Sequence, residues 1–241
     1  MVTIAQKELL HRYSAMRTTL GRLRLNYLAR THQWLWRCHS ASQRVVKRGF
    51  DAVASGTFLL VLSPLYLLIA LLIRLEDGGP ALFTQTRVGR FGREFTMYKF
   101  RSMCTDAEAR LQEIISQNHH KEGVTFKIKD DPRLTQIGKW LRKYSLDELP
   151  QVWNVFVGDM SLVGPRPPLP REVAHYTLAD RRRLAVPPGI TCLWQIGGRS
   201  EIDFSGQVKL DVEYIESAGF TTDVKILFKT VPAVVAAKGA C

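Results

Sequence analysis

An uncharged, strongly apolar stretch at residues 52–73 is the feature that most limits how this chain can fold. It runs for 22 residues, AVASGTFLLVLSPLYLLIALLI, without a charged side chain. As a straight helix at 1.5 Å per residue it would be roughly 33 Å long, about the thickness of a bilayer core. Length alone therefore predicts a helix that crosses a membrane.

The dipeptide Ser63-Pro64 in the middle of this stretch argues against a straight helix. Pro64 has no N–H to donate to the carbonyl of Leu60, and its ring pushes that carbonyl aside, so we expect a kink. Each limb is then only about half as long as the hydrocarbon layer is thick. The Ser63 hydroxyl can bond a freed carbonyl, which makes such a break tolerable in lipid.

Basic residues stand on both sides of the apolar stretch. Lys47 and Arg48 precede it, Arg74 follows it, and more arginines lie in 87–101. Because basic flanks favour the cytoplasmic side, this pattern favours a re-entrant helix that enters and leaves on one face. The residues alone leave a kinked membrane-crossing helix equally open. A signal peptide is not expected, since the stretch begins late and no small-residue cleavage site follows it.

The positive charge of the chain is concentrated at its beginning. The net charge is +12, and the first 48 residues hold ten basic residues and one acid. Apolar residues recur there at steps of three and four among arginines, which is typical of an amphipathic helix at a membrane surface. A helix packed on a partner and a transit peptide are alternatives. Since an apolar membrane segment follows, we expect an interfacial arm over 1–46 and no nucleic-acid partner.

The rest of the chain has the composition of a folded body. Two alternating runs around a Gly89–Gly92 turn predict a β-hairpin within 81–100, and apolar spacing predicts helices at 107–116, 134–143 and 222–237. The four cysteines are far apart, so neither a zinc site nor a disulfide scaffold is favoured. The pair His119-His120 is expected in a solvated loop. Glycine-rich nucleotide motifs and a nucleophile elbow are absent from the sequence.

The adjacent acids Asp147 and Glu148 are the best candidates for chemistry. One explanation is structural: Ser145 and Glu148 have capping-box spacing, although Pro150 suits Asp147 better as the N-cap. Either way Asp147 would lie at the positive end of a helix near Arg142. We therefore expect a low pKa for Asp147.

The same residue types also suit phosphate chemistry. Arg142, Lys143 and Arg166 can neutralise a bound phosphate, and Mg²⁺ binds one or two carboxylates together with water and phosphate oxygens. An ionised Asp147 placed there can attack phosphorus and form an aspartyl-phosphate. The residues alone leave this hypothesis beside the helix-capping one.

Six segments in fixed order resemble one known family. The sequence resembles the bacterial sugar transferases, the monotopic phosphoglycosyl transferases that begin glycan assembly on polyprenyl phosphate, over about residues 45–236. The segments are KRGFD (47–51), LSPLYLLIALL (62–72), FTQTRVGRFGREFTMYKFRSM (83–103), LRKYSLDELPQVWNVFVGDMSLVGPRPPLP (141–170), PGITCLWQIGGRS (188–200) and LDVEYI (210–215).

The resemblance implies roles for particular residues. Asp147 is expected to be the nucleophile, with Glu148 tied to a magnesium site that the two acids share, and Ser63-Pro64 is expected to break a re-entrant helix. Pro165 and Pro167 are expected to shape the loop around Arg166. The residues expected to hold substrate phosphates are Lys99, Arg101, Arg142, Arg166 and Arg199.

The resemblance also implies an architecture and a reaction. We expect a mainly helical α/β protein with an arm (1–46), a re-entrant membrane helix (47–75) and a compact catalytic domain (76–241) with interfacial helices, on the cytoplasmic face of a bacterial inner membrane. Its reaction would move a sugar 1-phosphate from a nucleotide sugar, with UDP-galactose or UDP-glucose favoured, to undecaprenyl phosphate, releasing UMP and starting exopolysaccharide synthesis. Homo-oligomers are possible. A non-catalytic membrane-surface adaptor is the alternative.

Two positions depart from the family pattern. Cys192 stands where relatives commonly have Gly, and Gly197 replaces a usual Ser or Asn. These departures concern details of substrate binding and not the type of reaction.

Overall fold

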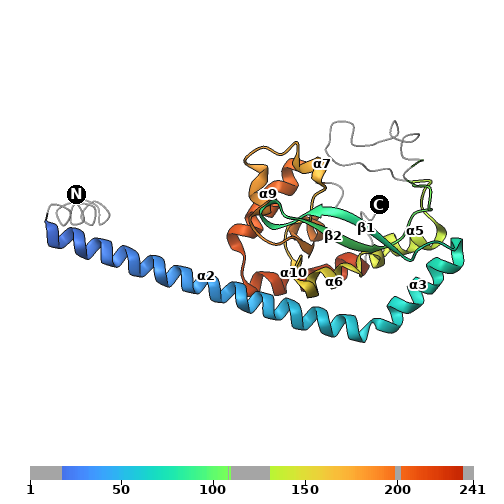
Figure 1. Ribbon diagram of the computed structural model, residues 1–241, viewed down its shortest axis with the longest axis horizontal. Helices are drawn as coiled ribbons and strands as arrows, with labels where there is room; N and C mark the ends of the chain where they lie inside the picture. Colours follow the sequence, from blue (N-terminus) through green and yellow to red (C-terminus); the bar gives the residue numbers. More distant parts are fainter. Residues whose placement is uncertain (1–17, 108, 110–130, 199–201, 236–241) are drawn as a thin grey trace. The chain divides into compact units, whose positions relative to one another are not determined.

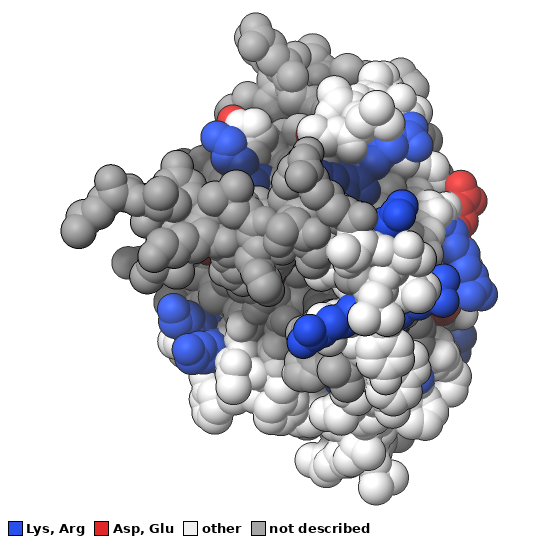
Figure 2. All heavy atoms as spheres, turned by 90° about the vertical axis from the view of Figure 1, so that its left-hand side faces the viewer, with Lys and Arg blue, Asp and Glu red and all other residues white. Residues whose placement is uncertain are grey.

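The computed structural model describes residues 18–107, 109, 131–198 and 202–235. The chain forms two units, Met1–Lys47 and Arg48–Cys241. In the first unit, the described residues belong almost entirely to helix α2 (Thr19–Val61), which continues into the second unit. Leu20, Leu23 and Tyr27 of this helix are exposed, as an arm with an apolar face requires. Most charged side chains on the face drawn in Figure 2 are Lys or Arg.

Helix α2 and helix α3 (Ser63–Asp77) meet at a bend of 60°. The bend falls at Ser63-Pro64, and the Ser63 hydroxyl donates to the carbonyl of Leu60 (2.8 Å). The expected kink and its repair are therefore confirmed. Among the described residues, each helix alone is too short or too polar to cross a membrane. The pair Ser42–Val61 and Ser63–Asp77 could cross one only if both helices are counted together, by length and composition.

The bent pair is tied to the rest of the second unit by polar contacts. Arg48 donates to the carbonyls of Val155 (2.7 Å) and Phe156 (2.6 Å), and Asp51 accepts from the Ser161 hydroxyl (2.7 Å). The hydroxyl of Tyr66 donates to the carbonyl of Leu149 (2.6 Å). The contact of Asp51 with Ser161 is buried, where hydrogen bonds are strong, and together the four contacts attach both limbs of the bend.

Apolar packing completes the attachment of α3. Ile69 and Ile73 are buried against Phe100 and Leu141. At the end of α3, Asp77 pairs with Arg101, while Glu76 accepts from the first free N–H groups of helix α5 (Gln136–Lys143). A carboxylate at a helix N-terminus is favourable, so α3 helps to start α5.

Two small sheets accompany the helices (Figure 1). The predicted hairpin is present: β1 (Leu82–Val88) pairs antiparallel with β2 (Glu94–Phe100), around a turn that Gly92 helps to form with a positive φ of 83°. The second sheet was not predicted, and it pairs β3 (Ser161–Val163) in parallel with β4 (Gly189–Thr191). A Cβ on Gly189 would lie 2.0 Å from the nitrogen of Gly164, so only glycine permits this contact.

Short helices fill the space around these sheets. The prediction of a mainly helical chain with a small β-hairpin is confirmed, and the helices predicted at 134–143 and 222–237 correspond to α5 and α10. The helix predicted at 107–116 and the pair His119-His120 lie wholly or largely outside the described residues. The remaining elements are η1 (Arg90–Gly92), η3 (Leu146–Glu148), α6 (Gln151–Val157), α7 (Pro170–Val173), η4 (Asp180–Ala185), α8 (Leu193–Gly197), α9 (Phe204–Ser217) and α10 (Phe220–Val235).

Two helical glycines should respond to alanine in opposite directions. A Cβ on Gly138 would lie 1.9 Å from the carbonyl oxygen of Ser102, whereas a Cβ on Gly49 would meet nothing within 4 Å. Gly138→Ala should therefore push α5 off its support and lower the unfolding temperature. Gly49→Ala should raise it, because Ala is favoured over Gly in a helix by about 1 kcal/mol. Thermal unfolding of both variants tests this, and equal effects would contradict the packing at Gly138.

Candidate active site

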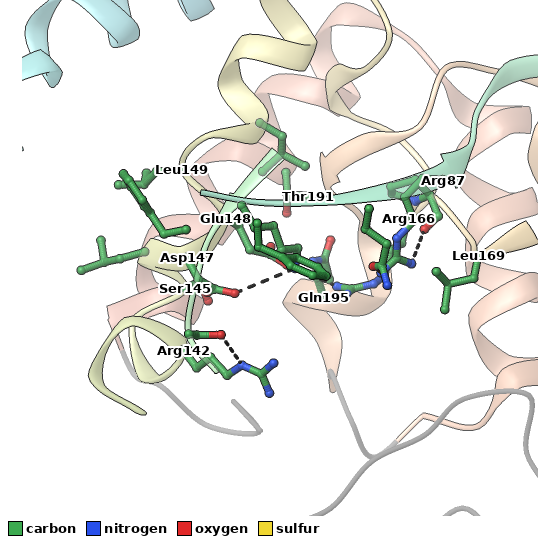
Figure 3. A pocket seen from close by; sticks show the side chains of 18 of the residues that line it. Arg87, Arg142, Ser145, Asp147, Glu148, Leu149, Arg166, Leu169, Thr191 and Gln195 are labelled. Carbon is green, nitrogen blue, oxygen red and sulfur yellow. Dashed lines mark hydrogen bonds and ion pairs between the residues drawn. The ribbon is translucent and has the colours of Figure 1, made fainter. Parts of the chain in front are cut away.

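A large cavity in the second unit contains the acid pair (Figure 3). Its volume is about 1320 Å³. Asp147 and Glu148 enter it from one side, while Arg87 and Arg166 reach in from the other. Drug-sized ligands occupy pockets of about 300–1,000 Å³, so this cavity has room for a larger ligand.

The acids are carried by a tight turn between two helices. Ser145 follows α5 with a positive φ of 55°, which turns the chain into the three-residue helix η3 that contains both acids. The Ser145 side chain makes no capping bond, and α6 starts only after Pro150. The capping-box hypothesis is therefore wrong, and so is Asp147 as the N-cap of α6.

Cations contact the acids directly. Lys99, from β2, donates to Oε1 of Glu148 (2.8 Å) and lies 3.9 Å from Oδ2 of Asp147. Arg166 approaches the same Glu148 oxygen at 3.6 Å. Arg142 is held beside them by a bond from its Nε to the Ser102 hydroxyl (3.1 Å). Three of the predicted phosphate-binding residues thus gather around the predicted acids.

The two acids differ in their titration. Burial raises the pKa of Asp147, Glu148 adds to the rise, and Lys99 opposes it. Burial also works against the charge of Glu148, but Lys99 and Arg166 outweigh it and lower the pKa of Glu148 to about 2. The predicted low pKa for Asp147 is therefore wrong, because the side chain is only 7% exposed and is not at the start of a regular helix.

Arg87 is a site residue that the sequence analysis missed. It donates to the carbonyl of Pro167 (3.0 Å) and to Gln85 (2.7 Å), so it holds the loop of Pro165, Arg166 and Pro167. Burial and the nearby Arg166 lower the pKa of Arg87 to about 10. The sequence shows that Arg87 belongs to the motif FTQTRVG, but its burial beside Arg166 depends on the tertiary fold.

The other predicted residues fall in different places. The carbonyl of Pro165 accepts from the N–H of Gly189 (2.8 Å), which attaches the loop to β4. Arg101 borders the cavity, but its guanidinium pairs with Asp77, and a role at phosphate stays a prediction. Arg199 lies outside the described residues. Ser63 and Pro64 form the helix bend and not part of the acid site.

The donor set at the acids suits one kind of metal ion. Among the described residues, no group of three or more His, Cys, Asp or Glu side chains is placed to hold a metal. Two neighbouring carboxylates, Asp147 and Glu148, do open into the cavity. This set fits Mg²⁺, which needs only one or two protein carboxylates when phosphate and water complete its shell.

A buried acid pair among cations, in a cavity of this size, is suited to a phosphate-containing ligand. Residues 42–237 match the family described as bacterial sugar transferase, and the chain belongs to this family.

The relatives include long and short proteins. The chain is 48% identical over 200 residues to the galactosyl transferase CpsE of Streptococcus agalactiae, and this match covers 83% of the chain and 44% of the relative. It is 42% identical over 202 residues to the undecaprenyl-phosphate galactose phosphotransferase of Salmonella typhimurium, covering 83% and 42%. The chain thus spans less than half the length of these two. A match to the exopolysaccharide production protein ExoY of Rhizobium meliloti, 40% identical over 198 residues, covers 81% of the chain and 88% of the relative.

The two acids should have opposite effects on stability. The raised pKa of Asp147 means that its charge destabilises the fold at neutral pH, so Asp147→Asn should raise the unfolding temperature. The lowered pKa of Glu148 means that its charge stabilises the fold above the ordinary glutamate pKa, a contribution lost as pH falls through about 2. Glu148→Gln should therefore lower the unfolding temperature.

Thermal unfolding of both variants at neutral pH measures these effects. Each 1 kcal/mol corresponds to a shift of about 2–4 °C in a domain of this size. Shifts of the same sign in the two variants would contradict the opposite titrations of the pair.

Proposed function

We propose that the chain transfers a hexose 1-phosphate from a UDP-hexose to undecaprenyl phosphate, with Asp147 as the nucleophile. The observation that carries this proposal is the acid pair in the cavity with cations against it, since Lys99 lies 2.8 Å from Glu148 and 3.9 Å from Asp147 and Arg166 lies 3.6 Å from Glu148. A raised pKa makes Asp147 a stronger base, and therefore a better nucleophile, than an ordinary carboxylate, while the charge of Glu148 keeps the surrounding cations in place.

The proposed reaction has two displacements at one phosphorus atom. An Oδ of Asp147 attacks the β-phosphorus of the donor, a P–O bond forms, and the bond from that phosphorus to the bridging oxygen breaks so that UMP leaves. A phosphate oxygen of the lipid then attacks the same phosphorus and releases the carboxylate of Asp147. The product is a polyprenyl diphosphate sugar, and Asp147 returns to its starting form.

The neighbouring cations are suited to this chemistry. Phosphoryl transfer depends mainly on positioning and on neutralising the charge of the oxygens around phosphorus. Lys99, Arg142 and Arg166 lie close enough to the acids to contact those oxygens. Arg87 positions Arg166 through its bond to Pro167.

Magnesium is the proposed cofactor, with Asp147 and Glu148 as its protein ligands. When bound, it would supply positive charge to the donor diphosphate. Glu148 is also paired with Lys99 (2.8 Å) and Arg166 (3.6 Å), and these cations balance part of the charge of the acid pair.

The substrates are proposed from the relatives. Two are named as undecaprenyl-phosphate galactose and glucose phosphotransferases, from Salmonella typhimurium and Komagataeibacter xylinus. We therefore favour galactose or glucose as the sugar, and exopolysaccharide synthesis as the process, as the name of ExoY indicates.

A membrane location is proposed because the acceptor is a lipid. The bent helix pair suits a re-entrant hairpin at the cytoplasmic face of the inner membrane, since basic residues flank it on both sides. A site at the membrane surface would let a soluble donor meet an acceptor whose phosphate stays in the headgroup layer.

Asp147→Asn should abolish UMP release from UDP-galactose and UDP-glucose, because an amide cannot form the covalent intermediate. With a donor labelled in the β-phosphate, the wild-type protein without acceptor should retain label on Asp147, and undecaprenyl phosphate should remove it. Glu148→Gln should reduce the rate and raise the magnesium concentration that is needed. UMP release at the wild-type rate by Asp147→Asn, or full activity in EDTA, would contradict these assignments.

Single cysteines at the two ends of the bent pair should report the same side of the membrane. Val46 and Leu75 are exposed positions at these ends, and each can be changed to Cys in a chain without its natural cysteines. A membrane-impermeant maleimide applied to intact cells should leave both unlabelled, and permeabilised cells should label both. Labelling of only one position in intact cells would defeat the re-entrant arrangement.

A further inference from the structure

One part of the cavity is lined by aromatic and amide side chains that the reaction above does not use. We call it the aromatic lobe, and it consists of Tyr176, Arg183, Trp194, Phe204 and Gln207. The rings of Tyr176 and Phe204 lie 5.4 Å apart at 41°. The Arg183 guanidinium lies 5.7 Å from the first ring and 5.8 Å from the second. Tyr176 is buried by this packing, whereas Phe204 is only partly buried and borders the cavity, so its ring is the flat surface that a planar group can reach.

The charge of Arg183 is compensated within the fold. Its Nη2 lies 2.5 Å from Oδ2 of Asp211, and Nη1 donates to the Tyr176 hydroxyl (3.0 Å). Both charged residues are almost fully buried, at 4% and 1% exposure. Burial raises the pKa of Asp211 to about 6 against the pull of Arg183, so the carboxylate is mostly ionised at neutral pH and balances the charge of Arg183. The aromatic lobe thus suits an uncharged group, whereas the excess of cations near Glu148 suits phosphate.

Arg166 and the aromatic lobe line the same cavity as the acids. Arg166 contacts Glu148 at 3.6 Å, and both Arg166 and Arg183 oppose the rise that burial causes in the pKa of the Cys192 thiol. Cys192 therefore lies within reach of both arginines. Its thiol donates to Oε1 of Gln195 (3.1 Å), and Gln195, Arg166 and the lobe residues line one cavity. Arg166 is therefore close to the acids through Glu148 and close to the aromatic lobe through Cys192.

We propose that the aromatic lobe binds the nucleobase of the donor, stacked against Phe204, with the adjoining phosphate near Arg166. This inference rests on the proposed function. The hexose is bonded to the phosphate that Asp147 attacks, so it stays near the acids. The base is separated from that phosphorus by a second phosphate and a ribose, and it is the part that extends past Arg166. Uracil is planar and uncharged at neutral pH, as the lobe requires.

Binding of UMP and of ribose 5-phosphate tests the proposal, because these two ligands differ only by the base. Phe204→Leu should weaken UMP binding about tenfold or more, since stacking on an aromatic residue contributes roughly 1–3 kcal/mol per base. Its affinity for ribose 5-phosphate should not change. The KM for UDP-galactose should rise with little change in kcat. Phe204→Tyr, which keeps the ring, should restore UMP binding.

The matched control is Phe91→Leu, a phenylalanine in the exposed hairpin turn. It should leave UMP binding unchanged, and thermal unfolding checks that every variant is folded. Wild-type UMP affinity in a folded Phe204→Leu would overturn the proposal, as would equal losses for UMP and ribose 5-phosphate. Weaker binding of galactose 1-phosphate with unchanged UMP binding would assign the lobe to the hexose instead.

The measurement of UMP binding separates this inference from the proposed function. UMP binding needs no turnover. A chain that binds UMP through Phe204 but releases none from any UDP-hexose would contradict the proposed function and support the base site. Normal UMP release by the Phe204→Leu variant, at an unchanged KM, would contradict the base site and support the proposed function.

Discussion

The ion pair between Lys99 and Glu148 is the contact on which the site depends. It joins the hairpin strand β2 to the turn η3, so it fixes both the position and the charge of the acid pair. Lys99 and Arg166 outweigh the effect of burial on the pKa of Glu148, whereas for Asp147 the effect of burial prevails and the pKa is raised. Two adjacent carboxylates thus acquire different properties from one shared set of cations, which is a common way for a site to separate two roles.

The bent helix pair contributes to the same site through the backbone. Tyr66 bonds the carbonyl of Leu149, which directly follows η3, and Asp77 holds Arg101 at the end of the same helix. Arg48 and Asp51 attach the other limb to α6 and β3. A change in the angle of the bend would therefore act on the turn that carries the acids. The bent apolar helix pair and the turn that carries the acids are therefore coupled through direct contacts.

The sequence predicted those features that a short segment determines by itself. The kink at Ser63-Pro64 follows from the chemistry of proline, and the hairpin follows from alternation around glycine. Lys99, Arg142 and Arg166, which the resemblance to the family indicated as phosphate-binding residues, do lie near the acids, and their role at phosphate stays a prediction. The low pKa of Asp147 was wrong, because it assumed a helix dipole where a turn from a left-handed Ser145 stands and because burial is not visible in a sequence. The pairing of β3 with β4 was missed, since three-residue strands show no periodicity.

The close contact of Gly164 with Gly189 has a consequence for how such a protein can change over evolution. It brings the two ends of the loop 164–189 together beside the paired strands β3 and β4. Arg166, Tyr176 and Arg183 all lie in this loop, whereas both acids lie outside it. Changes within this loop can therefore alter the surroundings of Arg166, Tyr176 and Arg183 without moving the turn that carries Asp147 and Glu148. The junction itself admits only glycine, because a Cβ on Gly189 would lie 2.0 Å from the nitrogen of Gly164.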